Sequence, residues 1–61
     1  MRVIVIRQQA HNVLAVVRIP DGSDGQATFE RWAADPSVRQ FLDEDALAAA
    51  RWEEVQVIEL A

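Results

Sequence analysis

Residues 2–7 have the sequence RVIVIR and set the architecture of the whole chain. Their four central residues are all β-branched, which favours a pleated strand and disfavours a helix. Because side chains alternate along a strand, the two valines point to one face of the sheet and the two isoleucines to the other. A strand that is apolar on both faces is typical of the centre of a sheet. We therefore predict that residues 2–7 form the central strand.

Two further strands are predicted on either side of this one. Residues 8–12 are polar and form a connection short enough for a hairpin, so residues 13–19 are expected to return as the second strand. Residues 55–60 have the sequence VQVIEL, whose apolar and β-branched side chains predict a third strand at the end of the chain.

The middle of the chain is predicted to be helical. Residues 20–25 form a turn, because they contain two Asp-Gly steps and a proline that cannot donate to a ladder. Ser23 followed by Gln26 predicts a capping box that opens a helix over residues 25–34, with Thr28 as an alternative start. Three apolar residues recur in it at helical spacing and are expected to pack on the sheet: Phe29, Trp32 and Ala33.

Two more short helices are predicted after this one. Asp35-Pro36 ends the first helix and starts the next, since Asp caps a helix and Pro suits its first turn. Acidic residues 43–45 then lie where a helix macrodipole favours negative charge, ahead of strong helix formers at residues 46–52.

These elements predict one α+β domain over residues 1–61, in the order β-β-α-α-β with the helical part divided into two or three pieces. A right-handed crossover places the last strand beside the first, so the predicted strand order is 2-1-3 with antiparallel neighbours around the centre. One layer of short helices covers only one face of such a sheet. The sequence does not show which face that is.

An uncovered apolar face usually marks an interface. If the isoleucine face of the central strand is the open one, the candidate oligomer interface is Ile4, Ile6, Leu14 and Val16, with Ile58 and Leu60 beside them. The alternative is the set of opposite parity, which contains Val3 and Val5. A chain of this length buries only about 60% of its unfolded surface, so association is an expected source of stability.

The net charge is −4, from ten acidic residues, six arginines and no lysine. Residues 1–19 hold three of the arginines and no acid, whereas residues 20–61 hold all ten acids. Nucleic-acid binding depends largely on Lys and Arg, and the predicted strands lack the aromatic residues on which RNA bases stack. We therefore expect no direct nucleic-acid binding. The acids either bind a basic protein surface or only keep the domain soluble.

Acidic residues bracket the last predicted helix, at residues 43–45 and 53–54. They form either a helix cap and a solvated helix end or an acidic surface that mimics the phosphates of nucleic acid. Trp and Arg are common interface anchors, and an Arg-Trp pair adjoins the second acidic pair. The candidate partner-binding residues are Asp43, Glu44, Asp45, Arg51, Trp52, Glu53 and Glu54.

Motifs for catalysis or metal binding are weak. His11 is the only histidine, and no serine or threonine is spaced to pair with it. Residues 21–25, DGSDG, resemble a calcium loop superficially, but the twelfth residue from Asp21 is Trp32 where an EF-hand needs Glu. A phosphate-binding P-loop needs a lysine, and the chain has neither lysine nor cysteine. We expect no enzyme activity, no catalytic residue, no cofactor and no metal.

The longest apolar runs, residues 13–17 and 46–50, have five residues each, far below the roughly 20 residues of a membrane helix. The apolar run near the start, residues 3–6, is also too short for a secretory signal. The expected location is the cytoplasm, without a membrane partner.

Three functions follow as hypotheses. The first is a small acidic module that inhibits or regulates a larger bacterial protein, including a nucleic-acid-handling complex; in general character the chain is similar to small phage- or plasmid-encoded inhibitors, with no shared motif. The alternative is a homo-oligomeric structural or antitoxin-like accessory protein, such as a homodimer. The third is an enzyme whose site is shared between subunits, with His11 as its base.

Overall fold

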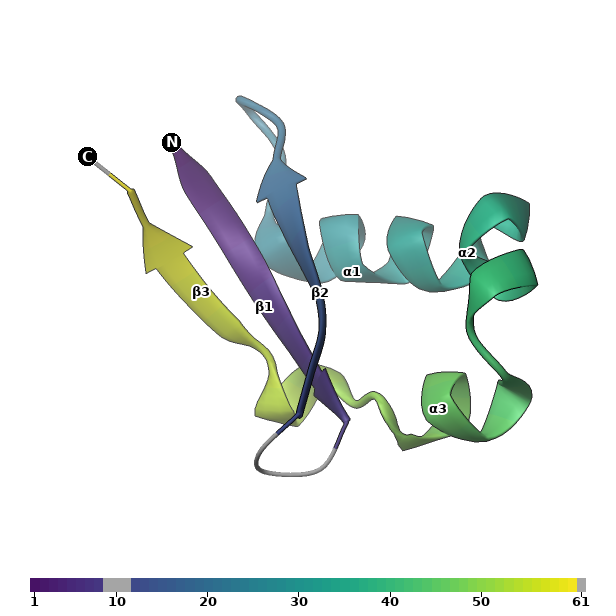
Figure 1. Ribbon diagram of the computed structural model, residues 1–61. Coiled ribbons are helices and arrows are strands. Elements are labelled where there is room, and N and C mark those ends of the chain that lie inside the picture. The colour runs from purple at the N-terminus through teal and green to yellow at the C-terminus, as the bar shows by residue number, and fades with distance from the viewer. Residues whose placement is uncertain (9–11, 61) are drawn as a thin grey trace.

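The computed structural model describes residues 1–8 and 12–60 and has a three-stranded sheet with one layer of helices (Figure 1). The strand order is β2-β1-β3, and both pairs are antiparallel, which confirms the predicted α+β class and order 2-1-3. The elements are β1 (Arg2–Gln8), β2 (Asn12–Ile19), α1 (Gly25–Ala34), α2 (Pro36–Phe41), α3 (Glu44–Ala49), the 3-10 helix η1 (Trp52–Glu54) and β3 (Gln56–Glu59).

The helices cover the isoleucine face of the central strand. Ile4 and Ile6 have no exposed surface and form the core with Ile19, against which the aromatic residues of α1 and η1 pack. Gly25, the first residue of α1, lies directly on this core: a Cβ there would be 3.1 Å from the Trp52 ring and 3.4 Å from Ile4. This face of the sheet is therefore closed by tight packing.

Aspartates cap all three α-helices, because each carboxylate accepts a hydrogen bond from a main-chain N–H in the first turn. Helix α1 begins at Gly25 as predicted, but its cap is Asp24, so the predicted capping box from Ser23 is wrong. The main-chain N–H of Ser23 instead donates to the Pro20 carbonyl at 3.0 Å and closes the preceding turn. The caps and their donors are Asp24 with Ala27 (2.7 Å), Asp35 with Ser37 (2.9 Å) and Asp43 with Ala46 (2.7 Å).

The last helix is shorter than predicted. Helix α3 ends at Ala49, and Ala50 is extended, whereas the sequence predicts helix through Trp52. Trp52 starts the separate turn η1 and packs on Phe29, with ring centroids 6.0 Å apart. Leaving the helix at Ala50 is what allows the indole to reach the core.

The hairpin contains a β-bulge that changes which residues share a face. Ile6 pairs with Ala15 and Arg7 with Val13, so Leu14 has no partner on β1. An extra residue in one strand shifts the alternation of side chains by one position. As a result Leu14 packs against the core cluster and Val13 replaces it on the open face.

Candidate protein-binding site

The sheet face away from the helices is open. Its floor is formed by Val3 and Val5 of β1, which are 7% and 8% exposed and lie between the two flanking strands. Val16 on β2 and Ile58 on β3 stand on either side of this floor and are 60% and 39% exposed. We call this surface, together with Leu60 just after β3, the open sheet face; Leu60 is 43% exposed and its main-chain N–H donates to the Met1 carbonyl.

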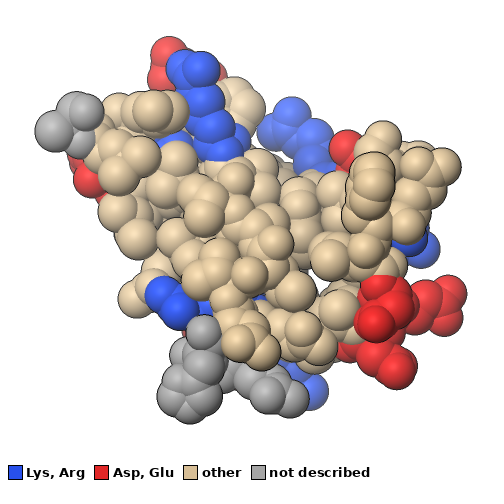
Figure 2. Space-filling view, in the orientation of Figure 1, with Lys and Arg blue, Asp and Glu red and all other residues tan. Residues whose placement is uncertain are grey.

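The open sheet face is apolar at its centre and basic at its ends. Figure 2 looks onto it and shows uncharged atoms across the sheet, with acidic side chains gathered over α3 at one side. Arg18 pairs with Val3 and so lies on this face, as does Arg7 next to Val13. Arg7 Nη2 donates a hydrogen bond to Gln56 Oε1 at 3.0 Å. The strands place no carboxylate on this face. Although the chain as a whole has a net charge of −4, its open sheet face is therefore apolar and basic.

The predicted oligomer interface is corrected by this arrangement. Ile4 and Ile6 lie under the helices and are not accessible to a partner, and Leu14 is half-buried beside them because of the bulge. Only Val16 of the four residues lies on the open sheet face. The parity that contains Val3 and Val5, which the sequence left as the alternative, is the one that faces away from the helices, and its exposed members are Val16 and Ile58 on the flanking strands.

The predicted acidic surface is divided between two elements. Asp43 caps α3, and Glu44 and Asp45 occupy its first turn, whereas Glu53 and Glu54 lie in η1. All five are exposed. The first group lies at the start of α3 and the second in η1, with the rest of α3 and residues 50–51 between them (Figure 1).

The Arg-Trp pair does not form an exposed anchor. Arg51 is exposed, but the Trp52 side chain is half-buried and packs against the core beside Gly25 and Phe29. Its ring contributes to the packing of the fold, and its role as a partner anchor stays a prediction.

Among the residues that the structure describes, no three acidic side chains are placed to hold a metal ion. The prediction for His11 lies outside the described residues. The turn at residues 20–25 places Gly22 at φ +82°, a conformation suited to glycine, and Asp24 uses its carboxylate as a helix cap.

Comparisons of the chain with protein-family models, with curated proteins and with solved structures found no match. Among the described residues, no helix has the length and apolar character needed to cross a membrane. The surfaces themselves are therefore the basis for any assignment of function.

Proposed function

We propose that this protein is a binding module that attaches to a larger protein through the open sheet face and thereby inhibits or regulates it. The observation that supports this proposal is the exposure of Val16 and Ile58 around the floor of Val3 and Val5. Exposed apolar side chains gathered on one face cost free energy in water, and a partner that covers them recovers it.

Charge indicates what kind of partner fits. Arg7 and Arg18 flank the apolar centre, and the strands contribute no acid to that face. The complementary surface is an apolar patch with carboxylates at its edge. A second copy bound face to face would bring the arginines of both copies to an interface without strand carboxylates, which favours a different protein over a homodimer.

The acidic residues of α3 and η1 have a different role in this proposal. They lie off the open sheet face, and they keep the chain soluble while its apolar surface is unoccupied. The chain has no cysteine, so its fold needs no oxidising compartment, and a cytoplasmic location is part of this proposal.

The test is affinity capture from a lysate of the cells that make the protein, at low and high salt, with three baits. The baits are the wild type, the double variant Val16→Asp/Ile58→Asp, and the control Ala49→Asp on the exposed end of α3. The proposal expects one larger protein to be retained by the wild type and the control, lost by the double variant, and weakened by salt because the rim contacts are ionic.

Three results would contradict this proposal. Retention of the same partner by the double variant would place the binding site elsewhere, with the acidic surface tested next by charge reversal at Glu44 and Asp45. Recovery of only the protein's own copies would support the homo-oligomeric alternative. Recovery of nothing would remove the basis for a regulatory partner.

A further inference from the structure

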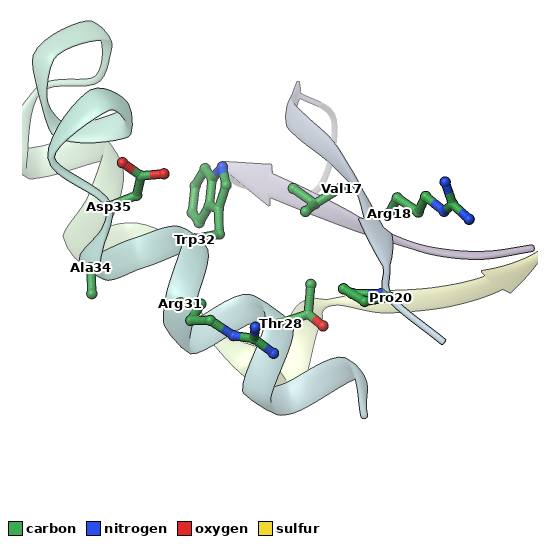
Figure 3. Close-up of a pocket in the computed structure, with 8 residues that line it drawn as sticks. All are labelled: Val17, Arg18, Pro20, Thr28, Arg31, Trp32, Ala34 and Asp35. Atoms are coloured by element: carbon green, nitrogen blue, oxygen red, sulfur yellow. The ribbon is translucent and has the colours of Figure 1, made fainter. Parts of the chain in front are cut away.

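A groove follows the free edge of β2, between that strand and helices α1 and α2. Strand β2 has β1 on one side only, so its other edge offers main-chain N–H and C=O groups that no described strand uses. Figure 3 shows Val17 and Trp32 pointing toward one another across this groove, while Arg18 points away from it. The groove is thus bounded by a strand edge and an aromatic side chain of α1.

The groove contains two hollows that share Trp32 as a wall. The first, of about 270 Å³, is lined by Ala15 of β2 and Phe41 of α2. The second, of about 410 Å³, is lined by Val17 of β2 and Arg31 of α1. Because Trp32 lines both, the hollows lie end to end along the strand.

The spacing of the hollows matches the repeat of an extended chain. Ala15 and Val17 are two residues apart, which corresponds to about 6.7 Å along a strand. A peptide strand added beside β2 has the same repeat, and its side chains i and i+2 point to the same side of the sheet. Two such side chains would therefore lie over the two hollows.

The two hollows differ in chemistry. Phe41 lies at the rim of the first hollow and is 85% exposed. Val38 of α2 and Leu42, which follows α2, add further apolar side chains to the lining of this hollow. At the second hollow, the exposed Arg31 has no hydrogen bond or ion pair to any described residue. The Asp35 carboxylate, which also lines this hollow, accepts a hydrogen bond from the Ser37 N–H. The first hollow suits an apolar side chain and the second an acidic one.

We infer that this groove binds an extended peptide as an added strand, with an apolar residue in the first hollow and Asp or Glu two positions away in the second. Main-chain hydrogen bonds to β2 supply affinity in this mode, and the alternate side chains supply specificity. The site lies on the strand edge rather than on the open sheet face, so each proposal can fail without the other.

The test begins with selection of short random peptides displayed on phage against the immobilised full chain. A synthetic peptide with the selected sequence is then titrated by fluorescence anisotropy. We expect the selected peptides to share an apolar and an acidic residue two positions apart. Arg31→Glu should weaken binding of the selected peptide about tenfold. A peptide in which Lys replaces the acidic residue should bind the Arg31→Glu variant with the original affinity.

Two controls separate the groove from other surfaces. Arg51→Glu makes the same charge change away from the groove and should leave affinity unchanged, as should Ile58→Asp, which lies on β3 at the opposite edge of the sheet. Methylation of those peptide amides that face β2 should abolish binding, whereas methylation of the intervening amides should not. Circular dichroism of each variant verifies that the fold is kept.

Several results would overturn the inference. The first is failure to select any peptide. The second is peptide binding that changes neither with Arg31→Glu nor with amide methylation. The third is competition between the peptide and the captured partner for the open sheet face. A stable dimer that excludes every peptide would also overturn it, because a second copy would then occupy the strand edge.

Discussion

The two faces of strand β1 are built from nearly the same residues but are covered in different ways. On one face Ile4 and Ile6 are fully buried beneath aromatic residues of α1 and η1. On the other, Val3 and Val5 are 7% and 8% exposed, and no described helix covers them. The difference comes from the size of the chain, because one layer of short helices is enough to cover one face. A small domain can therefore hold its core on one side of a sheet and offer a surface on the other.

The largest expected effect is the loss of a core side chain. Ile6→Ala should lower the free energy of unfolding by about 2–5 kcal/mol, since it leaves a cavity in a closed core. A domain of this size has a total of only about 3–9 kcal/mol. Val5→Ala, the corresponding truncation on the open sheet face, removes one carbon fewer and should cost about 1–2 kcal/mol. Urea unfolding followed by tryptophan fluorescence measures both, and equal costs would refute the contrast between the faces.

The next effect concerns the close approach of α1 to the core. Gly25→Ala should destabilise by about 1–2 kcal/mol, because the added methyl group meets Trp52 and Val57 at 3.1 and 3.2 Å. The same change in a Trp52→Phe background should cost less, since phenylalanine lacks the contacting ring atom. Thermal unfolding of the four chains gives the coupling. A stabilising Gly25→Ala would mean that the helix layer is loose.

A smaller effect is expected at the cap of α1. Asp24→Ala removes the acceptor for the Ala27 N–H and should cost about 1 kcal/mol, whereas Asp24→Asn keeps an acceptor and should cost little. Chemical denaturation distinguishes them. If alanine and asparagine are equivalent, the cap does not hold the helix on the covered face.

The smallest effect on stability is expected on the open sheet face. Val16→Thr should change the free energy of unfolding by no more than about 0.5 kcal/mol, because the side chain is mostly in water already. It should nevertheless weaken retention of the partner in affinity capture. A large loss of stability would show that the face is covered in the isolated protein.

Much of the fold could be predicted from local patterns. The β-branched run at residues 2–7, the turn residues 20–25 and the Asp35-Pro36 step all have strong local preferences, and they gave the element order and the strand order. The end of α3 could not be predicted in this way. Alanines continue a helix readily, but the burial of Trp52 is a tertiary effect that overrides their propensity.

The candidate site was harder to predict because it depends on register. Both faces of β1 are apolar, so nothing local to that strand shows which one the helices cover. The pairing of Val3 with Arg18 is the useful signal, since an arginine stem and its charge favour the solvated face. The bulge at Leu14 obscured that signal by moving one residue of β2 to the other face. The two hollows along β2 depend on the placement of α2, which the sequence does not specify.

The most direct test of the open sheet face is the solvent exposure of methyl groups, measured by NMR with a soluble paramagnetic probe. The free protein should show strong broadening at Val16 and Ile58 and none at Ile4 and Ile6. Addition of the captured partner should protect the first pair and leave the second unchanged. If Val16 and Ile58 are protected in the free protein as fully as Ile4 and Ile6, the face is already covered and the proposed binding surface does not exist.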